Sequence, residues 1–173
     1  MSHERNIQWL NDRKINYRRD PITDTPDIDN ESYMYFANGT YEYYRLFYTP
    51  SKITTYKSLK WHMLVLYYLN MDNIINSDFV TLAKFIANKE NGFVTFFIKN
   101  KLLENMIRNV LMQGGDPPVN RKRKIIFKDY SGLSFEQKMK IVGQLSGRQK
   151  LDKEKIYDTC LLYTSDAADD LLC

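Results

Sequence analysis

Three polar residues in the middle of the chain recur at helical spacing and could bind the edges of nucleic-acid bases. Lys101, Asn105 and Arg108 follow one another at i, i+4 and i+7, which places them along one stripe of a helix. Asn109 lies beside that stripe. Guanidinium and carboxamide groups form paired hydrogen bonds with guanine or adenine in the major groove. We therefore predict a DNA-reading helix face here, with an ordinary solvated helix face as the alternative.

A run of basic residues lies further along the chain, between Pro118 and an apolar segment. The apolar residues 125–127 predict a short strand. In a winged-helix protein, a basic wing at this position grips DNA phosphates, and a solvated basic loop is the alternative. The run comprises Arg121, Lys122, Arg123 and Lys124.

Residues 133–157 predict a second pair of helices that is joined by a basic turn. Ser134 and Gln137 have the spacing of a capping box, and Gly147 is placed to end the first helix of this pair. Basic side chains follow, and we expect them to contact phosphates. They are Arg148, Lys150, Lys153 and Lys155.

A cluster of tyrosines lies earlier, within residues 32–48. Asn38-Gly39 separates two aromatic runs and is typical of a type I′ turn, so a β-hairpin is predicted, with a helix ending near Asn38 as the competing interpretation. Tyrosine rings of this kind stack on single-stranded bases, pack on neighbouring helices, or contact a protein partner. The tyrosines considered for a partner are Tyr33, Tyr35, Tyr41, Tyr43 and Tyr44.

Residues suited to catalysis or metal binding are scarce. The two histidines are His3 near the N-terminus and His62 within a predicted helix, where a lone histidine is usually structural. The acidic residues between Asp20 and Glu31 do not match a calcium-binding loop and indicate a solvated linker. No Walker loop, dinucleotide-binding glycine pattern or zinc-protease motif occurs. We predict no enzyme activity, no cofactor and no metal.

The elements that must position these residues are mainly helical. Three helices are predicted before Gly114-Gly115: the first ends near Asn70, the second spans 78–88, and the third spans 93–112. The short turn at 88–92 gives the second and third helices the spacing of a helix-turn-helix motif. The predicted buried residues of the first helix are Tyr56, Leu59, Met63, Leu66 and Tyr67, and those of the second are Phe79, Leu82, Ala83 and Ile86. The third helix is predicted to bury Val94, Ile98, Leu102, Met106 and Val110, flanked by Phe97, Leu103, Ile107 and Leu111.

Over residues 52–157 this arrangement resembles small DNA-binding proteins of gut phages and the winged-helix replication initiators of plasmids and phages. The predicted fold is mainly α, of the α+β class. It has a winged-helix-like helical core, a small aromatic β-hairpin and a second helix-turn-helix segment. The expected function is DNA binding by a phage or mobile-element replication accessory protein or transcription regulator. The alternative is a protein-interaction or virion-associated module that uses the tyrosine-rich face.

The last residues of the chain, 160–173, resemble a translated sequencing adapter. The transposase end sequence used in library preparation translates in one frame to Cys-Leu-Leu-Tyr-Thr-Ser, which matches residues 160–165, and its next codons match Asp166 to Asp169. An amphipathic C-terminal helix is the alternative. We therefore expect the natural sequence to be cut near Thr159. The predicted regions are then an N-terminal arm and linker at 1–31, a hairpin with a three-helix core at 32–115, a basic strand with a helix-turn-helix segment at 116–159, and this tail.

Setting the tail aside changes what the composition implies. The whole chain has 25 Lys and Arg against 21 Asp and Glu. The tail contains three of the acidic residues and both cysteines, so residues 1–159 have a net charge of +7 and no cysteine. Residues 1–159 can therefore form neither a disulfide nor a Cys-bound zinc site. Their positive net charge favours a polyanionic partner.

Neither a membrane span nor a secretory signal is evident. No apolar run approaches the ~20 residues that a spanning helix needs, and the charged N-terminus lacks the apolar core of a signal peptide. We expect a protein of the bacterial host cytoplasm without a membrane partner. The abundance of Asn, Ile, Lys and Tyr indicates an AT-rich genome, such as that of a gut bacterium or its phage.

Overall fold

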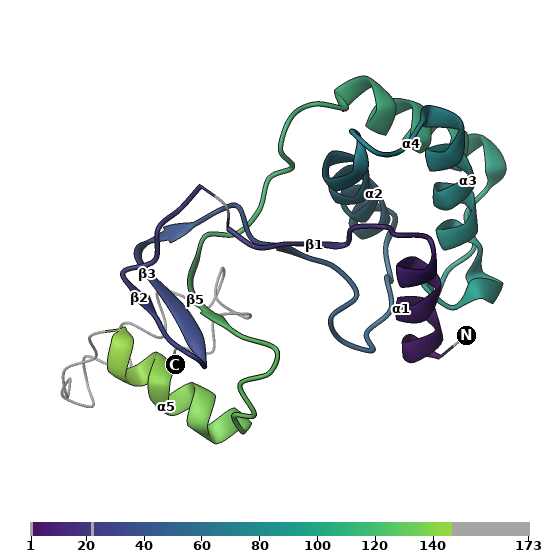
Figure 1. Ribbon diagram of the computed structural model, residues 1–173. Helices are drawn as coiled ribbons and strands as arrows, with labels where there is room; N and C mark the ends of the chain where they lie inside the picture. Colours follow the sequence, from purple (N-terminus) through teal and green to yellow (C-terminus); the bar gives the residue numbers. More distant parts are fainter. Residues whose placement is uncertain (1, 22, 147–173) are drawn as a thin grey trace, which may run out of the picture. The chain divides into compact units, whose positions relative to one another are not determined.

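A computed structural model describes residues 2–21 and 23–146, which form an α+β fold (Figure 1). The predicted α+β class is thereby confirmed. The chain divides into two compact units. Unit 1 comprises Met1–Thr25 and Thr40–Arg123, and unit 2 comprises Pro26–Gly39 and the chain from Lys124 onward. These units cut across the ranges 32–115 and 116–159 that the sequence suggests, because residues 26–39 share a sheet with residues after Arg123.

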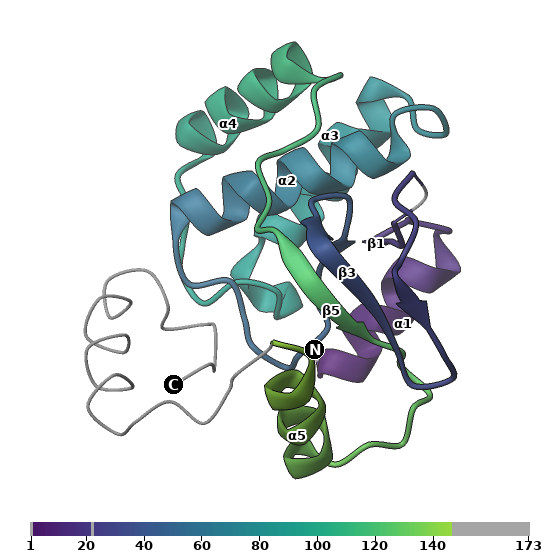
Figure 2. The same cartoon turned by 90° about the vertical axis from the view of Figure 1, so that its left-hand side faces the viewer.

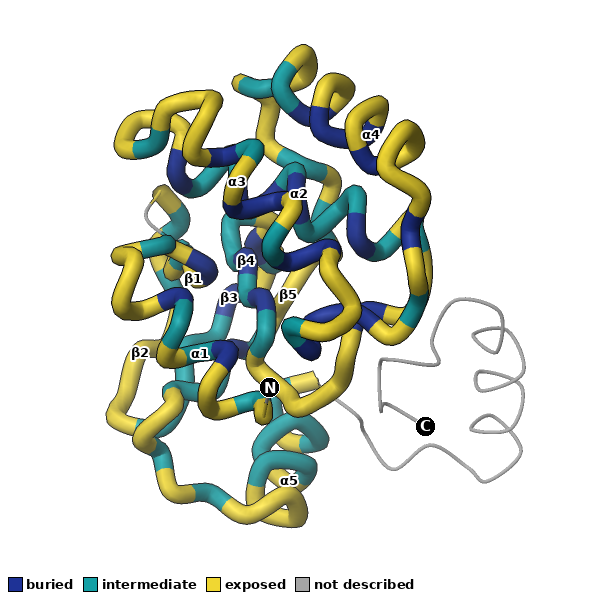
Figure 3. The backbone as a smooth tube through the Cα atoms, turned by 90° about the vertical axis from the view of Figure 1, so that its right-hand side faces the viewer, coloured by how far each residue is buried: buried dark blue, intermediate teal, exposed yellow. Residues whose placement is uncertain are grey.

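Unit 1 is built on helices that share one apolar core. Figure 3 shows buried positions along α2, α3 and α4, and these three helices contact one another. Most of the predicted buried positions are confirmed, and those of α2 and α3 that are fully or nearly fully buried include Leu59, Met63, Leu66, Phe79 and Ile86. Two positions predicted to be buried are wrong: Phe97 is 82% exposed and Leu102 is 46% exposed. Phe97 precedes α4, and the buried face of α4 is formed by Leu103, Met106, Ile107 and Val110, which leaves Leu102 at its edge. The helices of this unit are α1 (His3–Asp12), α2 (Tyr56–Asn70), α3 (Asn76–Ala87), the 3-10 helix η1 (Lys89–Asn91) and α4 (Asn100–Gln113).

The N-terminal segment contributes a ten-residue helix to this core. Within the predicted polar arm, Ile7, Trp9 and Leu10 suggested only one short helical turn that docks elsewhere in the protein. Ser2 caps α1 by accepting a hydrogen bond from the Arg5 amide, 3.4 Å away. Leu10 is fully buried, and the Trp9 ring stacks on Phe85 of α3 at a centroid distance of 4.1 Å. The apolar face of α1 therefore outweighs the polar composition of the segment around it.

The turn predicted at 88–92 is present as η1, but the helix predicted over 93–112 begins only at Asn100, so the connection between α3 and α4 is longer than predicted. Gly92 ends η1 with a positive φ of 86°, and residues 93–99 are not helical. Val94 forms a parallel bridge with Ile53: the Ile53 amide donates to the Phe93 carbonyl and the Thr95 amide donates to the Ile53 carbonyl, both over 3.0 Å. Bonds to a distant segment, together with the β-branched and aromatic side chains here, outcompete the helix that the apolar spacing suggested.

The hairpin predicted around Asn38-Gly39 is also wrong, because β3 (Tyr33–Thr40) runs through both residues. A type I′ turn needs positive φ at both central residues, and only Gly39 has one, at 74°. The chain turns earlier instead: the Asn30 side chain accepts hydrogen bonds from the Ser32 and Tyr33 amides, each 2.9 Å away. This turn joins β2 (Ile28–Asp29) to β3 as an antiparallel pair.

Within residues 26–39 and 124–146, unit 2 consists of a small sheet and the helix α5, and only the terminal residues of its strands, Thr40 and Arg123, belong to unit 1. The strand order is β2-β3-β5, and the views place β3 and β5 (Arg123–Phe127) side by side (Figure 2). The predicted strand at 125–127 is thereby confirmed. The predicted capping box of Ser134 and Gln137 is also present, at the start of α5 (Phe135–Leu145). Two contacts join this helix to the sheet, although none of its residues is fully buried: Lys138 Nζ lies 5.6 Å from the centre of the Phe127 ring, and the Tyr35 hydroxyl donates to the Leu145 carbonyl over 3.4 Å.

Candidate functional site

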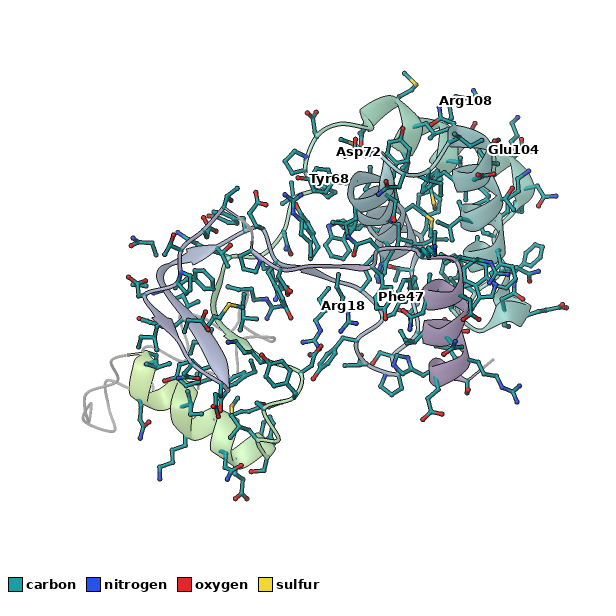
Figure 4. All side chains as sticks on the ribbon, viewed as in Figure 1. Arg18, Phe47, Tyr68, Asp72, Glu104 and Arg108 are labelled. Carbon is teal, nitrogen blue, oxygen red and sulfur yellow. The ribbon has the colours of Figure 1, made fainter. Side chains whose placement is uncertain are left out.

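The predicted DNA-reading stripe lies on the outer face of α4. Lys101, Asn105, Arg108 and Asn109 are all exposed, while Met106 on the opposite face is fully buried. Glu104 is exposed beside the stripe and lowers its positive charge (Figure 4). The structure therefore presents the four predicted residues to solvent on one helix.

The surroundings of α4 differ from those predicted for a helix-turn-helix motif. Residues 88–99 separate α3 from α4, whereas the turn of such a motif has about three or four residues. The strand that follows the basic run, β5, pairs with β3. In the second predicted helix pair, α5 is present, and Arg148, Lys150 and Lys153 lie outside the described residues, as does the tail from Cys160.

The basic run is divided between the two units. Arg121, Lys122 and Arg123 end unit 1, and Lys124 begins unit 2 within β5. All four side chains are exposed. Unit 1 therefore holds three of the four predicted phosphate contacts of this run.

The segment that leads to the basic run is fixed to unit 1 by three side chains. The Tyr44 hydroxyl donates to the Pro118 carbonyl over 2.6 Å, and the Trp61 indole Nε1 donates to the Val119 carbonyl over 2.8 Å. The Asn120 side-chain amide donates to the carbonyls of Tyr41 and Tyr43. We call residues 118–122 the connecting segment. Its contacts bring the start of the basic run, Arg121 and Lys122, close to Tyr41 and Tyr43.

The hydroxyl of Tyr44 is protonated throughout the neutral range. Burial raises its pKa above the usual value of 10.0, and the phenol of Tyr68 and the carboxylate of Glu42 raise it further, while Arg19 lowers it. A protonated phenol is the form that donates a hydrogen bond to a carbonyl. The contact between Tyr44 and the connecting segment is therefore insensitive to pH near 7.

A two-stranded ribbon adds two arginines that the sequence did not single out. β1 (Arg18–Arg19) pairs with β4 (Tyr44–Arg45) in antiparallel register, and Arg18 lies directly opposite Arg45. Residues directly opposite share one face of such a pair. On this face the Arg45 guanidinium donates to the Tyr43 hydroxyl over 3.0 Å and lies 3.3 Å from the centre of the Tyr48 ring.

The other face of the ribbon is structural. Arg19 donates to the Tyr68 hydroxyl over 2.6 Å and forms an ion pair with Glu42 at 3.1 Å. Tyr44 is 3% exposed, and its ring meets that of Tyr68 edge-on at 5.7 Å. These contacts hold the ribbon against α2 and leave Arg18 and Arg45 on the face away from it.

Contacts among exposed and half-buried residues of unit 1 join the rings of the tyrosine cluster to cations, and we call this set, with the adjoining Arg18 and Arg121, the basic–aromatic surface. Arg45 links Tyr43 to Tyr48, Asn120 links Tyr43 to Tyr41, and the Lys122 Nζ lies 5.4 Å from the centre of the Tyr41 ring. Figure 4 shows that Arg18 lies far from Arg108 within unit 1, so the α4 stripe is a separate region. The basic–aromatic surface comprises Arg18, Tyr41, Tyr43, Arg45, Tyr48, Arg121 and Lys122.

The predicted tyrosine cluster does not form one face. Tyr33 and Tyr35 belong to unit 2, where the Tyr33 ring meets Phe127 edge-on and the Tyr35 hydroxyl donates to the Leu145 carbonyl over 3.4 Å. Tyr44 is buried in unit 1, and Tyr41 is 59% exposed. In the sequence, only their charge distinguished Arg18 and Arg45. Arg18 lies in the segment that was interpreted as a polar arm, and Arg45 lies in the tyrosine cluster, which drew attention for its aromatic rings.

The described residues offer little for acid–base or metal chemistry. His62 Nδ1 lies 2.6 Å from the Ser58 carbonyl, and its ring meets Trp61 edge-on, so it packs within α2. Burial lowers the pKa of His62, and the hydrogen bond to Ser58 opposes this effect. Residues 2–21 and 23–146 contain no cluster of three or more potential metal ligands, and no helix there is long and apolar enough to cross a bilayer.

Comparison with known proteins gives no relative from which to infer function. No protein-family model matches the sequence, and no curated protein or solved structure matches it significantly.

Proposed function

We propose that the protein binds DNA, and that unit 1 makes the contact through the basic–aromatic surface. The observation that carries this proposal is the docking of the connecting segment against residues 41–44. It places Arg121 and Lys122 beside the aromatic rings and arginine of the same face. Cationic side chains that alternate with aromatic rings suit a ligand with a phosphate backbone and flat bases.

The distribution of charge supports a polyanionic partner for unit 1. This unit has 17 basic and 10 acidic residues, a net charge of +7. The described part of unit 2 has four basic and five acidic residues, a net charge of −1. Attraction of a nucleic acid therefore acts mainly on the unit that contains the proposed surface.

The α4 stripe has a secondary place in this proposal. A winged-helix protein would use Lys101, Asn105 and Arg108 to read bases in the major groove. Residues 88–99 replace the short turn of that motif, and Glu104 lies beside the stripe. We therefore assign phosphate binding to the basic–aromatic surface and keep groove reading by α4 as a prediction.

The alternative of a protein-interaction module has less support. It requires the tyrosines of residues 33–48 to expose a shared apolar face. Tyr33 and Tyr35 lie in the other unit from Tyr41, and Tyr44 is buried. The two tyrosines of unit 1 that are more than half exposed each lie against a cation, Tyr41 against Lys122 and Tyr48 against Arg45.

Replacement of the whole basic run by alanine tests the proposal. We expect R121A/K122A/R123A/K124A to bind DNA more weakly and with a flatter salt dependence, because each lost phosphate contact removes about 0.9 from the slope of log K against log salt on a duplex, or about 0.7 on a single strand. The measurement is a fluorescence titration of labelled DNA at several salt concentrations.

The control variant, R121K/R123K, keeps the charge of the run. It should retain the salt slope of the parent protein, because lysine also binds phosphates as a point charge. Equal affinity of the alanine variant and the parent protein at every salt concentration would contradict the proposal.

A further inference from the structure

We infer that the preferred ligand is a single strand, with Tyr41 and Tyr48 stacking on its bases; this inference rests on the proposed function. The two rings are 59% and 55% exposed, although aromatic side chains of this size are normally mostly buried. Both belong to the basic–aromatic surface and come from the same stretch of chain on either side of β4. An exposed ring next to a phosphate-binding cation is the arrangement that binds unpaired bases.

A cation holds each of these rings from one side. The Arg45 guanidinium carbon lies 3.3 Å from the centre of the Tyr48 ring, and the Lys122 ammonium lies 5.4 Å from that of Tyr41. Cation–π contacts of this length are attractive and restrict the ring. Each cation lies over one face of its ring, and we infer that a base stacks on the opposite face.

The cations are themselves held in place by the fold. Arg45 lies within β4, opposite Arg18, and also donates to the Tyr43 hydroxyl. Lys122 follows Asn120, whose side chain donates to the carbonyls of Tyr41 and Tyr43. The surface is therefore organised before any ligand binds, which lowers the entropic cost of ordering side chains on binding.

A duplex would leave the two tyrosines without a role. Its base faces are occupied by neighbouring pairs, so a ring reaches them only after unstacking, which costs a few kcal/mol per step. A duplex would engage only the cations of the surface. The exposed rings therefore favour a ligand whose bases are already free.

Paired binding measurements test this inference. The probes are a fluorescein-labelled single strand of about 16 nucleotides and the duplex of the same sequence, each titrated with the full chain at low salt. We expect tighter binding of the single strand. Tyr41→Leu and Tyr48→Leu should each weaken it about tenfold and leave duplex binding unchanged.

Tyr130 provides the matched control, because it is 77% exposed and lies in unit 2. Tyr130→Leu should bind the single strand as the parent protein does. Circular dichroism of the three variants checks that each keeps its fold.

The possible failures are distinguishable. If the duplex binds as tightly as the single strand, or if both surface variants keep the parent affinity for the single strand, the stacking role is wrong while DNA binding stands. If neither probe binds in a salt-dependent way, the proposed function itself is wrong. Weaker single-strand binding by Tyr130→Leu, equal to that of the surface variants, also overturns the assignment to these two rings.

Discussion

At the scale of single residues, Tyr44 joins the core of unit 1 to the segment that carries the basic run. Its ring is buried against Tyr68, and its hydroxyl donates to the Pro118 carbonyl. Burial raises the pKa of this hydroxyl, so the donor persists at neutral pH. One side chain therefore contributes both to packing and to the position of the connecting segment.

Tyr44→Phe keeps the ring and removes only this hydrogen bond. We expect the free energy of unfolding to fall by about 1–2 kcal/mol, because the partly buried Pro118 carbonyl loses its partner. Urea unfolding followed by circular dichroism measures the change. Tyr130→Phe is the control and should be near neutral, because this tyrosine is 77% exposed. Equal stability of the two variants would show that the contact with Pro118 contributes nothing.

At the scale of elements, the end of α4 sets where the connecting segment begins. Gly114 follows the last helical residue, and its amide donates to the Val110 carbonyl over 3.1 Å. A Cβ atom at this position would lie 2.9 Å from both the Leu111 carbonyl oxygen and a ring carbon of Tyr67. The close approach of α2 to this helix end therefore requires glycine.

The neighbouring glycine gives a matched pair of variants. Gly114→Ala should destabilise the protein by about 1–3 kcal/mol, because the helix end or the Tyr67 ring must move. Gly115→Ala should change stability by less than about 0.5 kcal/mol, because a Cβ there meets no atom within 4 Å. Thermal unfolding of both variants compares them directly. Similar melting temperatures would mean that the clash at Gly114 is relieved without cost.

The success of sequence-based prediction also varies by element. The buried faces of α2 and α3 could be predicted because residues such as Phe79 and Ile86 recur at helical spacing, and that spacing is a local signal. The start of α4 could not, because residues 93–95 bond to Ile53. Strand pairing with distant residues likewise carries β3 straight through Asn38-Gly39.

The candidate site was visible in the sequence only as separate parts. The basic run and the tyrosines stood out by residue type. Their contact, however, depends on the hydrogen bond that the Asn120 side chain donates to the Tyr43 carbonyl, and these two residues are 77 positions apart in the sequence. The pairing of Arg18 with Arg45 likewise depends on strand register. Residue type identified the chemistry, and long-range pairing decided which residues share a face.

At the scale of the whole molecule, we expect DNA affinity to depend more on where the positive charges lie than on the total net charge. Unit 1 has a net charge of +7, and the described part of unit 2 has a net charge of −1. A nonspecific attraction would depend mainly on net charge, whereas the proposed surface makes specific residues responsible. Two variants with the same change in net charge separate these possibilities.

The first variant, R18Q/K122Q, removes two charges from the basic–aromatic surface, and the second, K138Q/K140Q, removes two from α5 of unit 2. We expect the first variant to make the negative slope of log K against log salt shallower by about 1.5, since each lost phosphate contact on DNA accounts for about 0.7–0.9 of that slope. The second should leave the slope close to that of the parent protein. Fluorescence titrations of one labelled single strand across a salt series measure both. Equal losses in the two variants would mean that net charge alone governs binding and that unit 1 has no dedicated surface.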